Sequence, residues 1–434
     1  MAVYYSSILI MEHTMQNSDE IKTALERMGS EAKAAARKLA TATTGEKNNW
    51  LNAMADAIDA NTAFILAENS RDMEAGKANG LSAAMLDRLR LDEKRIKGIS
   101  DGLRHVVTLP DPVGRRLDDF KRPNGLDIEK VSVPIGVIAI IYESRPNVTV
   151  DATGLCLKAG NAVILRGGSE ALHSNLALAK LISDAGVKAG MPAGTIQMIP
   201  WTGHEAVSLM LKMNQYIDLV IPRGGERLIR AVVEQATMPV IKHYKGVCHT
   251  FVDESCDFDR ACDIIENAKV QRPSACNAIE TLLIHKNALA KFAPMIAKRL
   301  ANVELHADEA FRALVPSALP ATEDDWNREY LDLKLAVRTV DSLDEAIAHI
   351  NKYGSGHSDC ILTDNPEHAE KFLNEVDSAT VYVNASTRFT DGGEFGFGAE
   401  IGISTDKLHA RGPMGLVELT SYKYKVRGSG QIRA

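Results

Sequence analysis

The sequence predicts an α/β protein built around a doubly wound parallel sheet. The first observation is that residues 136–236 alternate short apolar stretches with longer amphipathic ones. Short buried strands that are joined by helices pair in parallel and are covered by helices on both faces. The second is a similar alternation over residues 248–385, and the third is a length of 434 residues, which suits about two or three domains.

The elements of the first part follow from local patterns, taken in chain order. Residues 18–108 are Ala-rich with apolar residues at helical spacing, and are predicted to be helical. Residues 125–134, "GLDIEKVSVP", are predicted to form a strand or an arm. The alternation that follows consists of the strand "GVIAIIY", the helix "VTVDATGLCLKAG" ending at Gly160, the strand "NAVILR", the helix "SEALHSNLALAKLISDAGVKAG", the strand "GTIQMIP", the helix "HEAVSLMLKM", the strand "IDLVIP" and the helix "GERLIRAVVEQA".

The second α/β part continues the same logic. It consists of the helix "DRACDIIENAKV", the strand "AIETLLIH", the helix "NALAKFAPMIAKRLA", the strand "KLAVRTV", the helix "SLDEAIAHINKYG" and the strands "SDCILT" and "ATVYVN". A Gly-rich stretch, "TDGGEFGFGAEIG", comes next. The last predicted strand lies in "GLVELTSYKYKV", because its residues alternate in character.

Composition and charge exclude several classes of protein. A formal net charge of −7, with basic residues spread along the chain, argues against a nucleic-acid or anionic-membrane surface. The longest apolar stretch, "VPIGVIAIIY", is shorter than the roughly 20 residues of a membrane helix. The six cysteines include no CxxC pair, so we expect reduced thiols, a cytoplasmic protein and no metal site.

The N-terminal stretch "MAVYYSSILIMEHTMQNSDE" has no basic region and no small-residue cleavage site, so it is not predicted to be a signal peptide. Met11 or Met15 is a candidate natural start. We expect the residues before them to be weakly ordered.

Two predicted strands end in an arginine and a glycine pair, "ILRGGSEA" and "IPRGGERL", and each leads into a helix. Glycines let the backbone approach a phosphate, and helix N-termini favour anions. Neither stretch matches GxGxxG, so ordinary glycine turns are the alternative. An arginine beside each pair favours an anionic ligand, and an arginine and a serine in the first favour the 2′-phosphate of NADP. The predicted cofactor residues here are Arg166, Gly167, Gly168, Ser169, Arg223, Gly224 and Gly225.

Cys276 follows a Pro-Ser-Ala break in "QRPSACNAIE", just before a predicted strand. From the residues alone, a small buried hydrophobe is the commoner role for such a cysteine. The other five cysteines are predicted to have that role. A reactive nucleophile is the alternative for Cys276.

Several stretches together resemble the aldehyde dehydrogenase superfamily, in particular its branch that reduces an acyl phosphate. They are "VPIGVIAIIYESRPNVTVDA", "CLKAGNAVILRGGSEALHSN", "IDLVIPRGG", "QRPSACNAIETLL", "DSATVYVNASTRFTDGGEFGFGAEIGIST" and "KLHARGPMGL", within about 130–420. The resemblance implies that Cys276 is the nucleophile and that the Asn147 amide helps to form the oxyanion hole. It implies that Glu329 holds the nicotinamide ribose, with Asp332 as a rival.

The resemblance also implies the reaction. Hydrolytic members carry a glutamate that activates water, but residues 240–250, "VIKHYKGVCHT", contain no carboxylate. A reductase of acyl phosphates should lack that base, because water would destroy its thioester. The implied activity is NADPH-dependent reduction of L-glutamyl 5-phosphate to L-glutamate 5-semialdehyde, the second step of proline biosynthesis. The alternatives are a phosphate-independent aldehyde dehydrogenase and a catalytically inactive NADP-binding protein of the same fold.

The implied substrate carries two anionic groups and therefore needs cationic partners. The candidate substrate-binding residues are Arg145, Arg388, Ser386, Thr387 and His409, and Lys242 and His243 could neutralise the departing phosphate. Arg388 is the strongest of these, because it leads from a predicted strand into the Gly-rich loop.

The resemblance implies an aldehyde-dehydrogenase-like arrangement of domains. Residues 1–117 and 135–245 would form the NADP-binding domain, and 246–385 the catalytic domain that contains Cys276. Residues 118–134 and 413–434 would form a β oligomerisation arm, and 386–412 a return segment lining the active site. A homo-oligomer, either a dimer or a tetramer, is implied, and a transient contact with glutamate 5-kinase is a further expectation.

Overall fold

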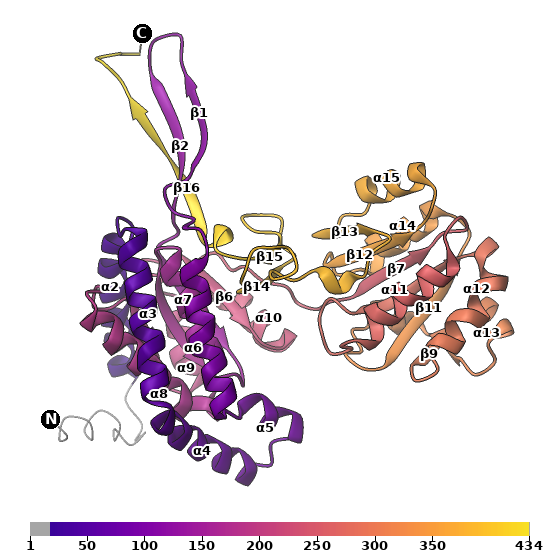
Figure 1. Ribbon diagram of the computed structural model, residues 1–434, viewed down its shortest axis with the longest axis horizontal. Helices are drawn as coiled ribbons and strands as arrows, with labels where there is room; N and C mark the ends of the chain where they lie inside the picture. The colour runs from indigo at the N-terminus through magenta and orange to yellow at the C-terminus, as the bar shows by residue number, and fades with distance from the viewer. Residues whose placement is uncertain (1–17, 434) are drawn as a thin grey trace. The chain divides into compact units, whose positions relative to one another are not determined.

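The computed structural model of the protein describes residues 18–433 (Figure 1). The expectations about Met11, Met15 and the order of the N-terminal stretch lie outside the described residues. Contacts divide the chain into two compact units. Unit 1 consists of the described residues up to Ile241 together with those from Gly415 onward, and unit 2 is Lys242–Met414.

Unit 1 contains a four-stranded sheet in which every neighbouring pair of strands is parallel. The strand order is β5-β4-β3-β6, so the chain starts at β3 and turns to opposite sides for β4 and β6. The central strand β3 is buried along its whole length because both faces of the sheet are covered. This confirms the predicted doubly wound sheet. The strands are β3 Val137–Tyr142, β4 Ala162–Gly167, β5 Ile196–Met198 and β6 Leu219–Arg223.

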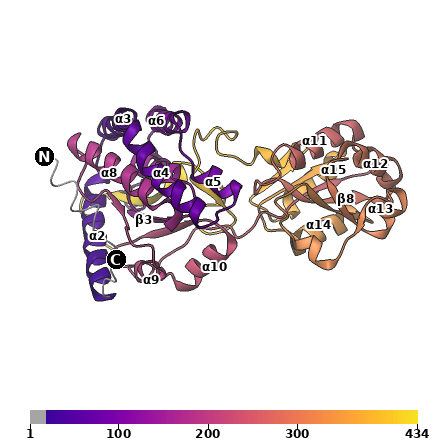
Figure 2. The same ribbon diagram turned by 90° about the horizontal axis from the view of Figure 1, so that it is seen from below.

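Helices cover the sheet of unit 1 on both faces, and the predicted helical region of residues 18–108 is confirmed. Figure 2 shows α3, α6 and α8 on one side of this sheet and α9 and α10 on the other. Local signals set the helix ends: Thr43 and Glu46 form a capping box at the start of α3. The helices are α2 Ser18–Leu39, α3 Thr44–Ala60, α4 Thr62–Ala78, α5 Ala83–Leu89, α6 Glu93–Thr108, α7 Asn147–Lys158, α8 Leu172–Lys188, α9 His204–Met210 and α10 Glu226–Gln235.

An antiparallel three-stranded sheet forms an arm on unit 1, in the order β1-β2-β16. It consists of β1 (Arg116–Lys121), β2 (Asp127–Pro134) and β16 (Thr420–Arg427). In Figure 1 these strands extend together away from the helices of the same unit. Alternate residues of β16 leave large apolar side chains exposed, namely Tyr422, Tyr424 and Val426.

Unit 2 contains a seven-stranded sheet in the order β10-β9-β11-β8-β7-β12-β13, again with parallel pairs. Side chains alternate between its faces: Leu282 and Ile284 pack with α11 and α12, whereas Leu283 packs with Phe372 on α15. The strands are β7 Cys248–Val252, β8 Ile279–His285, β9 Glu304–Ala307, β10 Leu319–Pro320, β11 Lys334–Val340, β12 Ser358–Leu362 and β13 Thr380–Val383, and a separate pair is β14 Gly402–Ser404 and β15 Gly412–Met414. The helices are α11 Phe258–Val270, α12 Lys286–Arg299, α13 Glu309–Leu314, α14 Leu343–Tyr353 and α15 Pro366–Glu375.

None of the helices within residues 18–433 combines the length and the apolar character needed to cross a bilayer.

Candidate active site

The two glycine pairs lie on either side of the carboxyl end of β3 in unit 1. The strand register places Tyr142, the last residue of β3, opposite Gly167 on β4 and opposite Arg223 on β6. This is the point at which the chain turns to opposite sides of the sheet. Ligands of open α/β sheets bind in the crevice outside such a point, so the sheet edge is suited to a cofactor.

The first glycine pair lies in a tightly packed turn, next to Arg166. A Cβ atom on Gly167 would lie 2.1 Å from Nδ2 of the buried Asn175, so a larger residue would have to displace that side chain. Arg166 donates from Nη2 to the carbonyl of Thr202 at 2.6 Å, while its buried Nε has no partner among the described residues. Burial lowers the pKa of Arg166, and the exposed Ser169 begins the next helical turn. A partly buried guanidinium with a spare donor suits an anionic group of a cofactor.

Two carboxylates that the sequence reasoning missed lie at this sheet edge. Glu143 accepts a hydrogen bond from the backbone N–H of Gly225 at 3.0 Å, just before the first residue of α10. The Glu143 carboxylate therefore occupies the N-terminus of α10. The N–H of Gly225 points toward a negatively charged oxygen there. Glu170 accepts from the N–H and the hydroxyl of Ser144 at 2.6 and 2.8 Å. The only signal in the sequence was an acid directly after β3 and another directly after Ser169.

Asn147 is the first residue of α7, directly after the loop that leaves β3. Its amide donates from Nδ2 to Asp151 Oδ2 at 2.7 Å, one helical turn further on. That contact fixes the amide orientation and leaves the second N–H available for another acceptor. Arg145 is exposed in the same loop, next to Ser144, whose φ of 52° is unusual for a residue other than glycine.

Cys276 lies at the amino edge of the sheet in unit 2, shortly before β8. The thiol of Cys248, the first residue of β7, donates to the carbonyl of Cys276 at 3.3 Å. A Cβ atom on Gly246 would lie 1.9 Å from the same carbonyl oxygen. The approach of residue 246 to Cys276 therefore requires glycine.

Exposure separates Cys276 from most of the other cysteines. Cys276 is partly exposed, whereas Cys156, Cys248, Cys262 and Cys360 are buried. Burial raises the pKa of Cys360 to about 12 and that of Cys262 to about 11. Cys256 is partly exposed as well, but burial, together with Asp253 and Asp364, raises its pKa to about 12. These thiols remain protonated at neutral pH and are poor nucleophiles.

Asn277 joins the Cys276 loop to the segment that carries Arg388. Its Nδ2 donates to the carbonyls of Thr390 at 2.9 Å and Arg388 at 3.3 Å. The hydroxyl of Thr387 donates to the Asn277 carbonyl at 2.6 Å. Ser386 accepts from the N–H of Arg388 at 3.3 Å and caps the short turn. Three predicted substrate residues, Ser386, Thr387 and Arg388, are thus held next to Cys276.

The carboxylate of Glu329 contacts the stretch 240–250, which contains no Asp or Glu. Its Oε1 accepts from the N–H of Gly246 at 2.8 Å. The rival Asp332 is exposed and accepts from the neighbouring N–H of Leu333 at 2.8 Å. Of the two, Glu329 is the one that contacts a residue packed against Cys276.

Of the remaining candidates, Lys242 and His243 lie at the start of unit 2 and His409 lies near its end. Lys242 forms an ion pair with Asp406, with 2.6 Å between Nζ and Oδ1, and His243 Nδ1 contacts the carbonyl of Ile403 at 3.0 Å. The positive charge of Lys242 is therefore already compensated. His409 is exposed, with a left-handed φ of 70°.

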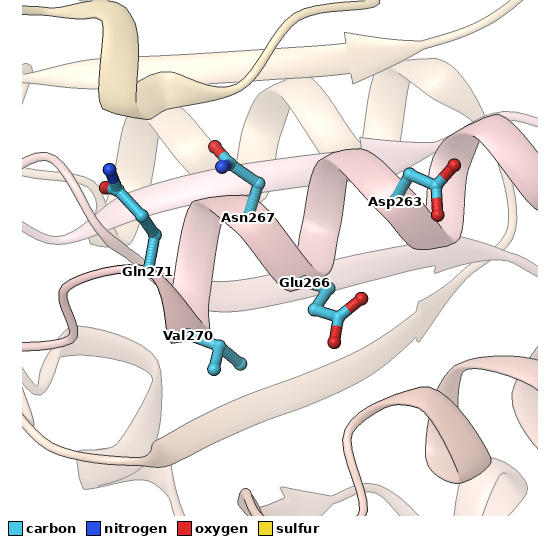
Figure 3. Close-up of a pocket in the computed structure, with 5 residues that line it drawn as sticks. All are labelled: Asp263, Glu266, Asn267, Val270 and Gln271. Atoms are coloured by element: carbon cyan, nitrogen blue, oxygen red, sulfur yellow. The ribbon is translucent and has the colours of Figure 1, made fainter.

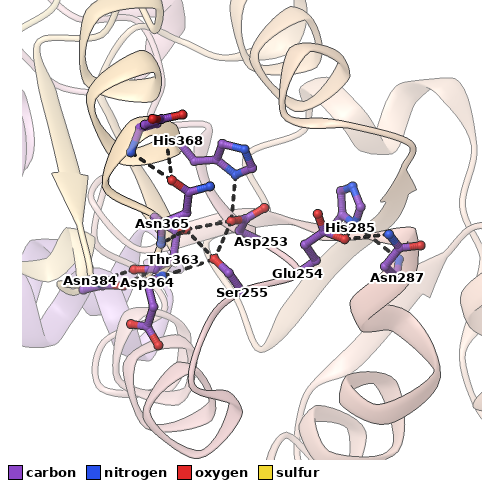
Figure 4. Close-up of polar contacts among 11 residues, drawn as sticks. Asp253, Glu254, Ser255, His285, Asn287, Thr363, Asp364, Asn365, His368 and Asn384 are labelled. Atoms are coloured by element: carbon purple, nitrogen blue, oxygen red, sulfur yellow. Dashed lines mark hydrogen bonds and ion pairs between the residues drawn. The ribbon is translucent and has the colours of Figure 1, made fainter.

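The carboxyl edge of the same sheet holds a different polar cluster (Figure 4). Asp253 Oδ2 accepts from Ser255, Thr363 and His368 at 2.8, 2.7 and 2.9 Å. Asn384 donates to the carbonyl of Thr363 at 2.7 Å. These bonds tie together the ends of β7, β12 and β13, which gives the cluster a structural role.

A shallow pocket of about 310 Å³ runs along α11 (Figure 3). It is lined by Asp263, Glu266, Asn267, Val270 and Gln271. Two carboxylates make it unsuited to an acyl phosphate, and none of the predicted site residues lines it. Within the described part of the chain, no group of three or more His, Cys, Asp and Glu side chains is placed to hold a metal ion.

Comparisons with known proteins identify the family of the chain. The family model described as "Aldehyde dehydrogenase family" matches residues 9–314 and 335–410. A protein of Geotalea daltonii named gamma-glutamyl phosphate reductase is 57% identical over 411 residues, which is 94% of this chain and 98% of that protein. One of the same name from Moorella thermoacetica is 58% identical over 407 residues, 93% of this chain and 97% of the other.

Solved structures of the same family also match the chain. The crystal structure of gamma-glutamyl phosphate reductase from Thermotoga maritima is 48% identical, with a TM-score of 0.93, covering 94% of this chain and 100% of that one. An acetylating aldehyde dehydrogenase from Geobacillus thermoglucosidasius is 15% identical with a TM-score of 0.67, covering 97% of this chain and 100% of that one, and it supports the fold alone. The chain therefore belongs to the aldehyde dehydrogenase family, within the group whose curated members are named gamma-glutamyl phosphate reductase.

Proposed function

We propose that this enzyme reduces L-glutamyl 5-phosphate to L-glutamate 5-semialdehyde and releases inorganic phosphate, the second step of proline biosynthesis. The observation that carries the proposal is the 57% identity, over 94% of the chain, to a relative named for this reaction. The chemistry of the site supports it. Cys276 is a partly exposed thiol, and the stretch 240–250 contains no carboxylate that could activate water as in hydrolytic members.

Cys276 carries the covalent steps. Its thiolate attacks the acyl carbon, the C–S bond forms, and the C–O bond to phosphate breaks with its electron pair leaving on phosphate. A bound nicotinamide cofactor supplies the hydride that reduces the resulting thioester. Collapse of the thiohemiacetal then returns the electron pair of the C–S bond to sulfur and releases the aldehyde.

The chain supplies donors for the two tetrahedral oxyanions. We assign them to the backbone N–H of Cys276 and to the Asn147 amide, whose remaining N–H has no partner among the described residues. Each such donor lowers the barrier by roughly 3 kcal/mol. Glu329 is assigned to the nicotinamide ribose. Its Oε1 accepts from the N–H of Gly246, the residue that packs against the carbonyl of Cys276.

The sheet edge of unit 1 is assigned to the cofactor, with Arg166 and Ser169 selecting NADP. The partnerless Nε of Arg166 supports this choice. Reversing the charge with Arg166→Glu should raise the KM for NADPH roughly 10- to 100-fold and that for NADH by less than about threefold. Initial rates with both cofactors measure the two constants, and Arg37→Glu on the exposed face of α2 is the matched control. Equal effects on both cofactors would remove Arg166 from cofactor selection.

The reverse reaction provides the first test of the function. The enzyme receives glutamate 5-semialdehyde, through its cyclic pyrroline form, and NADP, and NADPH is followed with and without inorganic phosphate. We expect strict dependence on phosphate. An equal rate without phosphate that yields glutamate would establish the phosphate-independent aldehyde dehydrogenase instead, and no rate under either condition would establish an inactive protein.

The other assignments extend this proposal. Unit 1 outside the arm is taken as the cofactor domain and unit 2 as the catalytic domain. The exposed row Tyr422, Tyr424 and Val426 suits the arm to pairing with another copy of the chain, which sedimentation equilibrium would measure. None of the six cysteines, all of which lie in the described part of the chain, is in a disulfide, which is consistent with a cytoplasmic location. A contact with glutamate 5-kinase remains part of the proposal and is testable by co-sedimentation.

A further inference from the structure

Two arginines come from the two segments that enclose Cys276. Arg388 donates from Nε to Oε1 of Gln271 at 2.8 Å, and its carbonyl accepts from Asn277 at 3.3 Å. Gln271 directly precedes Arg272, whose carbonyl accepts from the N–H of Ala275 in the turn that leads to Cys276. Arg388 is therefore held by residues on both sides of the nucleophile, and Arg272 begins the turn on which the nucleophile lies.

The positive charges of both arginines lack an ion-pair partner. Neither Arg272 nor Arg388 forms an ion pair with any residue of the described chain, and Arg388 has two guanidinium nitrogens beyond the one that Gln271 uses. Elsewhere in unit 2, Arg260 is paired with Asp364 and Arg411 with Asp377. Lys242, the other cation considered for the phosphate, is paired with Asp406.

The positive charges of Arg272 and Arg388 repel one another. Burial lowers the pKa of Arg388, the charge of Arg272 lowers it further, and the sulfur of Cys276 and the carboxylate of Asp391 oppose this. Asp391 is itself occupied, because its Oδ1 accepts from the N–H groups of Gly393 and Glu394 at 2.8 and 3.3 Å. Two neighbouring cations repel one another, and an anion between them removes that repulsion.

We propose that Arg272 and Arg388 form the subsite for the phosphate group that leaves the acyl carbon when Cys276 attacks. This inference rests on the proposed function. The leaving phosphate is one bond from the carbon that Cys276 attacks, so its subsite must adjoin the nucleophile. Guanidinium groups match phosphate oxygens with paired donors and remain charged at any working pH. In the reverse direction the same subsite holds inorganic phosphate for its attack on the thioester.

The subsite is tested by the reverse reaction in Arg272→Gln and Arg388→Gln, with inorganic phosphate as the varied substrate. Each variant should raise the KM for phosphate roughly 10- to 100-fold, while the KM for NADP changes by less than about threefold. Arg260→Gln is the matched control, because it removes an exposed arginine near the start of α11, whereas Arg272 follows the end of that helix. Arg272→Lys keeps the charge and should recover part of the lost affinity.

A second readout does not depend on turnover. Inorganic phosphate should slow the alkylation of Cys276 by iodoacetamide in the wild type and in Arg260→Gln, but not in Arg272→Gln or Arg388→Gln. An unchanged KM for phosphate in both variants, in an enzyme that requires phosphate, would overturn the subsite and leave the proposed function standing. A wild type that needs no phosphate would overturn both.

Discussion

Replacing Cys276 with serine should lower kcat by roughly 10⁴-fold or more while leaving NADPH binding intact. A serine hydroxyl is a far weaker acid than a thiol, so almost no alkoxide is present to attack the acyl carbon. Apart from Glu329, the assigned cofactor residues lie in unit 1, whereas Cys276 lies in unit 2. Initial rates measure the first effect, and a fluorescence titration with NADPH measures the second.

Cys256→Ser is the matched control, because Cys256 is the other partly exposed thiol. It should keep most of the activity, since burial and two carboxylates suppress ionisation of that thiol. Iodoacetamide should modify Cys276 first in the wild type. Substantial turnover by Cys276→Ser would show that the reaction does not proceed through a thioester on Cys276. Loss of NADPH binding would indicate a structural role for the thiol.

Replacing Lys269 with methionine should cost about 3–5 kcal/mol of stability in unit 2. Lys269 and Glu280 form an ion pair with 2.6 Å between Nζ and Oε2, and both side chains are fully buried. Glu280 Oε1 also accepts from the N–H of Leu331 at 3.1 Å. The substitution leaves a buried carboxylate without its counter-charge. Hydrogen exchange of the amides of α11 and β8 measures the loss where it arises.

The sign of the pH dependence follows from the pKa of Glu280. Burial raises it to about 7, although Lys269 opposes the rise. A carboxyl group whose pKa is higher in the folded chain stabilises it fully below its unfolded pKa, and that contribution is lost as pH rises through the folded pKa. Because Lys269→Met removes the opposing charge, the variant should lose more stability at about pH 8 than at about pH 5.

The double variant Lys269→Met/Glu280→Leu is the control for the buried pair. It removes both charges and should recover most of the stability that the single variant loses. A single variant within about 1 kcal/mol of the wild type at pH 8 would show that water or local movement compensates the carboxylate.

Much of the fold was predictable from the sequence, because buried parallel strands are nearly continuous apolar runs. β3 carries that signal along its whole length, β4 over residues 162–165 and β8 over residues 282–284. The exposed β10 has two residues and β9 has four, too few for a pattern to emerge from the surrounding chain. Both were missed, as was α13, which has six residues.

The candidate site was predictable where a local motif carries it and not where distant residues meet. The sequence of the turn before β8, together with the resemblance to the aldehyde dehydrogenase superfamily, predicted that Cys276 is the nucleophile. The bond from Asn277 to Thr390 joins residues 113 positions apart, and that from Arg388 to Gln271 joins residues 117 positions apart. No periodicity or spacing encodes such contacts, so the link between nucleophile and arginine appears only in the folded chain.

The pairing of β2 with β16 has a consequence for the synthesis of the protein. Arg427 binds Glu129 across a sequence separation of 298 residues, so β2 leaves the ribosome long before its partner is made. At roughly 5–20 residues per second, the nascent chain carries an unpaired strand edge for roughly 15–60 s. Unpaired edges attract other strands, so a chaperone that covers residues 116–134 during translation would protect the growing polypeptide from aggregation.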